Sequence, residues 1–139
     1  MNEVHELKAI RGAITVEADE PEQVIAAARE LTQELLAQNG LAPDDIVSAI
    51  FTATADLVSA FPAVGAREAG LVNTALLCAQ EIPVPGSQPR CIRALVHAYV
   101  KAGQPVRHVY LREAAALRPD WAGAASGGSA SGKPSAAGA

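Results

Sequence analysis

One stretch decides the fold of this chain: DEPEQVIAAARELTQELLAQNG, residues 19–40. The proline and acidic residues at 19–22 suit the first turn of a helix, where the helix dipole favours negative charge. The Asn-Gly pair at 39–40 suits a helix end. Between them, apolar residues recur at the spacing of one helical face, at Val24, Ala28, Leu31 and Leu35. The stretch therefore predicts a long amphipathic helix with one face to bury.

The segments around this helix are short and apolar, which is typical of strands. We expect strands over 9–16, 46–54, 71–78 and 106–111, a short helix over 63–69, and a further strand over 114–117. Periodicity leaves residues 91–100 open between strand and helix. One long helix among short strands predicts an α/β (α+β) fold, in which a mixed β-sheet packs on that helix as a single domain.

Composition supports one domain followed by a tail. The chain has 139 residues, of which 50% are hydrophobic and only 4% aromatic, so we expect an aliphatic core. After residue 121 the sequence becomes AGAASGGSASGKPSAAGA. That segment holds no large apolar side chain and is predicted to be disordered. We therefore assign residues 1–121 to the domain and 122–139 to the tail.

Charge and cysteine content exclude several classes of protein. A net charge of −4 argues against a nucleic-acid surface. No stretch approaches the roughly 20 apolar residues that cross a bilayer, and the first ten residues do not form a signal peptide. Cys78 and Cys91 do not make a disulfide framework, and the Cys and His spacing suits no metal site. We expect a cytoplasmic protein with reduced thiols and no metal.

The common catalytic motifs are also missing from the sequence. It contains no phosphate-binding loop, dinucleotide-binding glycine pattern, nucleophile elbow or zinc-protease motif. His5, His97 and His108 are scattered, and we interpret them as surface or sheet residues. A dyad of Cys78 with His97 or His108 stays open as an alternative, although the spacing does not favour it.

A different signal comes from polar residues that interrupt apolar segments. Arg11, Arg93 and Arg118 each lie in or beside such a segment, as do Glu81 and Tyr110. An arginine is costly to bury without a partner. Each one therefore either faces solvent, pairs with a nearby glutamate, or joins the others in an anion-binding pocket. Arginine suits such a pocket because its planar group binds carboxylates through two parallel hydrogen bonds.

Five motifs in order resemble one enzyme family. They are RGAITVE (11–17), SAIFTATADLVSAFPA (48–63), CAQE (78–81), CIR (91–93) and RHVYLREAAALRPD (107–120). Together they resemble the small monofunctional chorismate mutases of the Bacillus type, over most of residues 9–121. The resemblance implies a trimeric pseudo-α/β barrel with active sites between adjacent subunits. It also implies the rearrangement of chorismate to prephenate without a cofactor.

The resemblance assigns roles to individual residues. Arg11 matches the arginine that holds a substrate carboxylate, and Arg93 matches the one beside the ether oxygen of the breaking bond. Glu81 and Cys78 match residues at and next to the ring hydroxyl, while Tyr110 matches a tyrosine that touches a carboxylate. The pocket wall and mouth are matched by Phe61, Arg67, Leu117 and Arg118.

The chemistry of this reaction agrees with the residues that are present. The rearrangement is a one-step pericyclic reaction, so it needs no nucleophile, base or metal. Its substrate is a dicarboxylate, for which arginines are suitable partners. Two alternatives stay open at this stage: an imine deaminase of the Rid type, and a non-catalytic trimeric module that binds a small carboxylate. The CAQE and RHVYLREAAALRPD segments favour the mutase.

Overall fold

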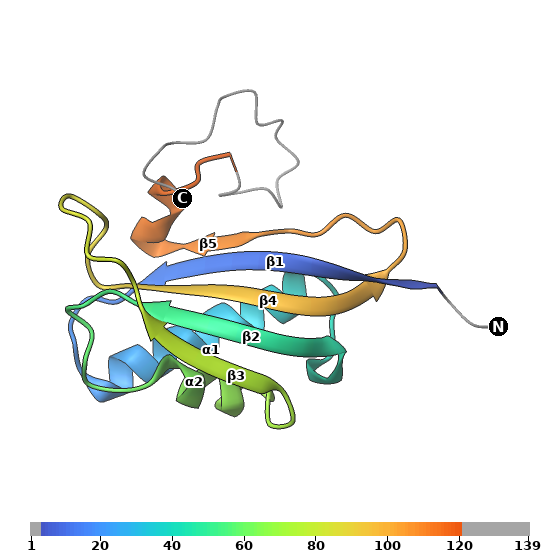
Figure 1. The fold of residues 1–139 in the computed structure, drawn as a ribbon, viewed down its shortest axis with the longest axis horizontal. Helices are drawn as coiled ribbons and strands as arrows, with labels where there is room; N and C mark the ends of the chain where they lie inside the picture. Colours follow the sequence, from blue (N-terminus) through green and yellow to red (C-terminus); the bar gives the residue numbers. More distant parts are fainter. Residues whose placement is uncertain (1–3, 121–139) are drawn as a thin grey trace.

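The computed structural model describes residues 4–120, so the predicted tail at 122–139 lies outside the described residues. The chain forms a mixed sheet with helices packed on it (Figure 1). Its helical elements are α1 (Pro21–Gln38), α2 (Pro62–Glu68) and the short 3-10 helices η1 (Pro43–Asp45) and η2 (Arg112–Ala116). Its strands are β1 (His5–Thr15), β2 (Ile46–Ala53), β3 (Ala75–Gln80), β4 (Cys91–Lys101) and β5 (Val109–Leu111).

The five strands of this sheet run in the order β3-β2-β4-β1-β5. The central strand β4 pairs antiparallel with both β1 and β2. The outer strands β3 and β5 pair parallel with β2 and β1. The predicted mixed sheet is therefore confirmed, and residues 91–100, which periodicity had left open, belong to the strand at its centre.

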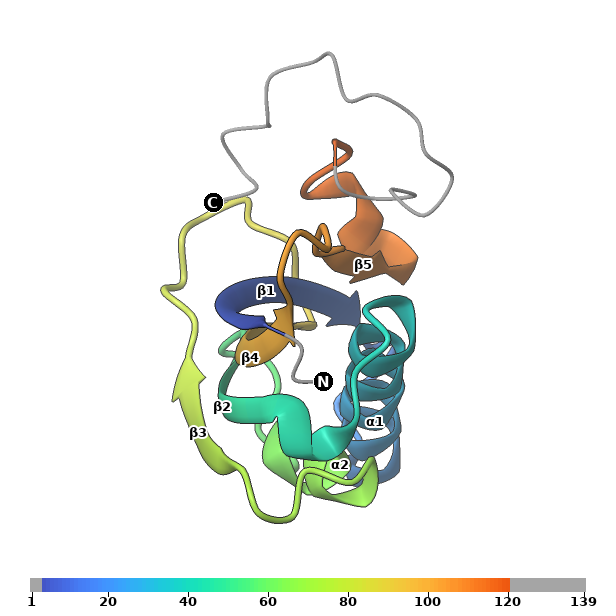
Figure 2. The same ribbon diagram turned by 90° about the vertical axis from the view of Figure 1, so that its right-hand side faces the viewer.

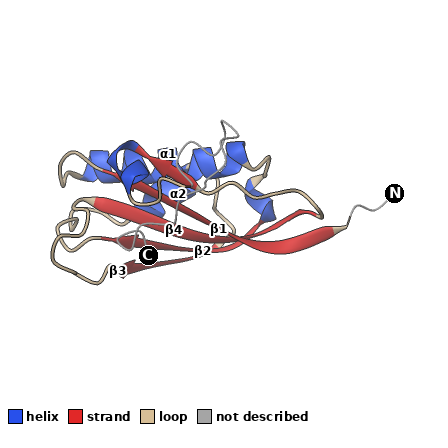
Figure 3. Cartoon of the chain, turned by 90° about the horizontal axis from the view of Figure 1, so that it is seen from above, coloured by secondary structure: helices blue, strands red, loops and turns tan. Residues whose placement is uncertain are grey.

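Both α-helices cover the same face of the sheet (Figures 2 and 3). The predicted face of α1 is buried there, with Val24, Ala28 and Leu31 at 0% exposure. Even-numbered residues of β1 and β4, such as Ile10 and Ile92, point toward the helices and join the same core cluster. That cluster consists of aliphatic side chains and Phe51, as the composition predicted.

Among the described residues, the other face of the sheet carries no α-helix, and away from the short helix η2 it exposes large apolar side chains. Leu7 and Tyr99 lie directly opposite each other on β1 and β4 and are 55% and 50% exposed. Leu77 on β3 is 62% exposed and lies opposite Ile50 of β2. Soluble chains seldom expose such a surface along a sheet unless a partner covers it.

Two element predictions were wrong. Residues 114–117 do not form a strand: Ala114 and Leu117, three residues apart, both turn inward onto Ala13, Cys91 and Tyr110. The chain leaves β5 through Arg112, whose positive φ of 57° ends the extended run. The third strand covers Ala75–Gln80 rather than 71–78, because Leu71 is buried in the core against the helices before the strand begins.

Candidate active site

Strand register brings the interrupting polar residues together on the open face of the sheet. In one row across the sheet, Thr52 lies opposite Arg93, Arg93 opposite Ala13, and Ala13 opposite Tyr110. Arg11 lies in the neighbouring row, opposite Leu95. Alternate residues of a strand share a face, so all these polar side chains point away from the helices. Arg11, Thr52, Glu81 and Arg93 line one cavity of about 210 Å³.

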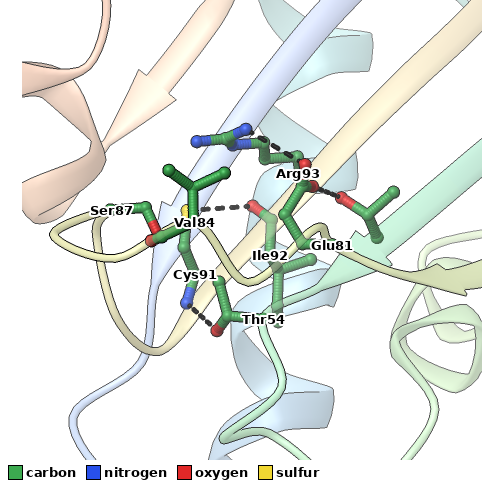
Figure 4. A network of polar contacts seen from close by, with 8 residues as sticks. Thr54, Glu81, Val84, Ser87, Cys91, Ile92 and Arg93 are labelled. Atoms are coloured by element: carbon green, nitrogen blue, oxygen red, sulfur yellow. Dashed lines mark hydrogen bonds and ion pairs between the residues drawn. The ribbon is translucent and has the colours of Figure 1, made fainter. Parts of the chain in front are cut away.

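Glu81 and Arg93 form an ion pair in this cavity. Nη1 of Arg93 lies 3.3 Å from Oε1 of Glu81, and the two side chains are 17% and 25% exposed (Figure 4). The other oxygen of the carboxylate, Oε2, accepts a hydrogen bond of 2.5 Å from the hydroxyl of Thr52. The backbone amide of Glu81 donates to the carbonyl of Ala53, which fixes the residue just beyond the end of β3. The pair therefore combines a fixed cation with a fixed anion at an open surface.

Tyr110 extends the site toward β5. Its side chain packs with Ala13, Cys91 and Leu117. Burial raises the pKa of the Tyr110 phenol, while the positive charges of Arg11 and Arg118 act in the opposite direction. The phenol consequently keeps its proton at neutral pH, and it can donate a hydrogen bond to an anion held among the arginines.

Arg118 is placed beside Tyr110 by the turn that follows β5. Its Nε and Nη2 atoms donate to the two carboxylate oxygens of Asp120 at 3.2 and 3.0 Å. Arg112, earlier in the same segment, donates to the carbonyl of Thr15 and to Glu30 of α1. These bonds attach the segment to β1 and α1, so Leu117 and Arg118 have a defined position at the edge of the site.

His108, the residue just before β5, supports Arg11. Its Nδ1 accepts a hydrogen bond of 3.0 Å from the backbone amide of Arg11. Burial lowers the pKa of His108, and the charges of Arg11 and Arg118 lower it further. The imidazole is therefore neutral near pH 7, which leaves Nδ1 able to accept this bond.

Phe61, Arg67 and Cys78 do not join the arginines within one chain. Cys78 packs against the core on the helix side of β3. Together with Phe61 it lines a separate cavity of about 380 Å³, and Arg67 is exposed on α2. The predicted site residues thus form two groups. The first holds Arg11, Glu81, Arg93, Tyr110, Leu117 and Arg118; the second holds Phe61, Arg67 and Cys78.

The open alternative of a Cys-His dyad within one chain is wrong. Cys78 points to the helix side of the sheet, whereas His97 points to the open side and contacts Ser48 at 3.2 Å. The Nδ1 atom of His108 is engaged by Arg11. The sheet therefore separates the thiol from His97, and His108 precedes β5, at the opposite edge of the sheet from β3.

Comparison with known proteins identifies the family. The family model described as chorismate mutase type I matches residues 7–121. The chain belongs to the type I chorismate mutase family. A chorismate mutase AroH of Thermus thermophilus is 52% identical over 116 residues, which cover 82% of this chain and 95% of that protein. The AroH of Bacillus subtilis is 36% identical over 116 residues, covering 82% and 91%.

A solved structure shares the fold of this mutase. The chorismate mutase from Clostridium thermocellum superposes with a TM-score of 0.76 at 46% identity, covering 79% of this chain and 99% of that one. The family match covers residues 7–121 and so begins two residues before the region 9–121 over which the motifs showed a resemblance. It also selects the mutase over the Rid-type deaminase.

Two residues of the site were missed by sequence reasoning. Thr52 and His108 each bond to a member of the arginine group, yet neither interrupts an apolar segment with a charge. For Thr52 the available signal is alternation, because it is two residues from Ile50 on β2 and shares its strand face. His108 precedes β5, so strand alternation does not indicate its position.

The described residues add two observations about this mutase. No cluster of three metal-ligating side chains occurs within residues 4–120. In the same span, no helix has the length and apolar character needed to cross a membrane.

Proposed function

We propose that this protein converts chorismate to prephenate on the open face of its sheet. The observation that carries the proposal is the placement of two guanidinium groups, Arg11 and Arg93, and one carboxylate, Glu81, around a single cavity. A dicarboxylate with a ring hydroxyl is complementary to that set of charges. The family and its relatives support the same reaction.

Arg93 has the central role in the proposed mechanism. During the rearrangement the C–O bond of the ether breaks as a C–C bond forms, and negative charge grows on the ether oxygen. A guanidinium fixed there stabilises the transition state more than the bound substrate, which is the requirement for catalysis. Arg93 is already held by Glu81 and the strand, so little reorganisation is needed as the charge develops.

The remaining residues bind and orient the substrate. Arg11 and Tyr110 are assigned to a carboxylate, Glu81 to the ring hydroxyl, and Arg118 and Leu117 to the pocket mouth. Holding both ends of the molecule favours the compact, chair-like conformer in which the reacting carbons approach each other. No proton is transferred and no covalent intermediate forms, so the protein supplies only binding, orientation and charge.

We further propose that the active protein is a homotrimer with each pocket shared by two subunits. Phe61, Arg67 and Cys78 lie apart from the arginines in one chain, so an adjacent subunit would supply them. The open sheet face exposes Leu7, Leu77 and Tyr99, and burying such a surface is a strong driving force for association. The free thiols of Cys78 and Cys91 suit a cytoplasmic location.

Light scattering should therefore give the mass of three chains at concentrations where the protein is active. Association would bury the apolar side chains of the sheet face and complete the pocket. Replacing Leu77 with glutamate should shift the mass toward the monomer and reduce turnover in parallel. A monomeric parent protein that still converts chorismate would refute the shared pocket.

Truncation should separate the domain from the proposed tail. Removing residues 122–139 should leave turnover and stability nearly unchanged, because that segment has no side chains able to pack. Removing residues from Leu117 onward should mainly raise KM, because Arg118 and the buried Leu117 would both be lost. Equal activity of the two truncated proteins would remove Arg118 from the site.

The rate should depend little on pH between about 6 and 9. Burial lowers the pKa of His108, which favours the neutral imidazole, and raises the pKa of Tyr110, which keeps the phenol protonated over this range. The guanidinium groups keep their charge throughout. Activity should fall only on the acid side, where His108 gains a proton and Nδ1 no longer accepts from Arg11. A bell-shaped profile centred near neutrality would contradict this mechanism.

The direct test of the proposed function is the loss of chorismate absorbance on addition of the purified protein, with prephenate identified as the product. A Rid-type deaminase or a carboxylate-binding module would leave chorismate unchanged. Binding without turnover, detected by calorimetry, would favour the non-catalytic module.

A further inference from the structure

Thr52 is a neighbour of Glu81 that has no role of its own in the proposed reaction. Thr52 lies on β2, directly opposite Arg93 and in register with Ala79, two residues before Glu81. Its hydroxyl donates to Oε2 of Glu81 at 2.5 Å, while Nη1 of Arg93 contacts Oε1 at 3.3 Å. The two oxygens of the carboxylate are thus held by two different strands.

We propose that Thr52 is a positioning residue, which holds the Glu81 carboxylate in the orientation that the substrate needs. This inference rests on the proposed function of Glu81 as the partner of the substrate's ring hydroxyl. Thr52 itself acts only through Glu81.

The need for such a residue follows from the position of Glu81. Its backbone is fixed by the bond to Ala53, but the residue lies beyond the end of β3 and its side chain has several freely rotating bonds. Threonine is branched at Cβ, so its hydroxyl has few accessible positions on a strand. A stiff donor on β2 therefore restricts a flexible acceptor.

The hydrogen bond from Thr52 to Glu81 also limits how closely the carboxylate approaches Arg93. A charge-assisted bond between a guanidinium and a carboxylate is typically about 2.7–2.9 Å, and the contact here is longer, at 3.3 Å. Thr52 shares the charge of the carboxylate and holds one oxygen toward β2. Without it, Glu81 would be able to turn fully onto Arg93 and weaken the positive charge that the ether oxygen requires.

Removing the hydroxyl of Thr52 should lower catalysis without unfolding the protein. Thr52→Val keeps the shape and β-branching, and we expect kcat/KM for chorismate to fall about tenfold, as for the loss of one hydrogen bond to a charged group. Thr52→Ser restores the donor and should stay within about twofold of the parent. Ser48→Ala removes a hydroxyl from the same face of the same strand, far from Glu81, and serves as the matched control.

A double-variant cycle tests whether Thr52 acts through Glu81. In a Glu81→Ala background, measured at high enzyme concentration, Thr52→Val should have almost no further effect. The inference would be overturned if Thr52→Val were as active as the parent, or if Thr52→Ser lost as much kcat/KM as Thr52→Val. It would also be overturned if Thr52→Val lowered kcat/KM by the same factor in the Glu81→Ala background as in the parent. Thermal unfolding checks the fold, and Thr52→Ala replaces the valine variant if that one does not fold. An inactive parent would instead refute the proposed function.

Discussion

Arg93→Lys is expected to lower kcat/KM for chorismate by on the order of a hundredfold to a thousandfold, and Arg93→Ala by at least as much. Arg93 is proposed to meet the ether oxygen and a carboxylate of the same substrate. A planar guanidinium can reach both, whereas an ammonium is a point charge on a flexible stem. Charge on the ether oxygen grows only as the bond breaks, so kcat should fall as well as kcat/KM.

The structure adds a second reason why lysine should fail. Arg93 is partly buried beside Glu81 and opposite Thr52, so its guanidinium is held at a fixed depth above the sheet. A lysine ammonium could still pair with Glu81, but it would then lie close to the carboxylate rather than at the ether oxygen. Its charge would be retained and its position would be wrong.

Arg29→Lys provides the matched control for this experiment. Arg29 forms an ion pair with Glu68 between α1 and α2, and both side chains are more than 40% exposed. Exposed pairs contribute little, so the same chemical change there should alter activity by no more than about twofold. Circular dichroism confirms that each variant is folded. Folded Arg93→Lys with activity within about tenfold of the parent would disprove the proposed role.

The sequence singled out three charged residues that the fold places around one cavity. Arg11 and Arg93 interrupt apolar segments and Glu81 ends one, and a charge is costly in such a segment unless it is paired. The family resemblance assigned their roles. The long helix and the strands β1 and β2 were also predictable, because periodicity depends only on neighbours within one element, whereas β4 was left open between strand and helix. Element ends were less well predicted, since Leu71 and Leu117 are placed by the core they pack into rather than by local pattern.

The partners within the site could not be derived from the sequence. Thr52 meets Arg93 only because β2 and β4 pair in one particular register, and a single sequence does not specify that register. Cys78 and Glu81 are three residues apart, so alternation along a strand places them on opposite faces, as the structure has them. The family resemblance nevertheless assigns both residues to one pocket.

Gly65→Ala is expected to destabilise the protein by about 3 kcal/mol, because it would force two helices apart. Gly65 lies in α2, at the point where α2 crosses α1 and the backbones of the two helices are almost in contact. A Cβ atom there would lie 2.3 Å from the carbonyl oxygen of Ile25 and 2.7 Å from the backbone nitrogen of Arg29. Both neighbours belong to the helix backbone, which cannot rotate away as a side chain can.

Gly86→Ala is the control, because it separates destabilisation by steric crowding from destabilisation by an unfavourable backbone conformation. Gly86 has a positive φ of 83° but nothing within 4 Å of an added Cβ, so its cost should be about 1–2 kcal/mol from the left-handed conformation alone. Denaturant unfolding of both variants at one protein concentration measures the difference, since association would shift the transition. Gly65→Ala with the stability of the parent would mean that the helices do not approach this closely. Because Gly65 lies between Phe61 and Arg67 on α2, a displaced helix should also raise KM in the folded fraction.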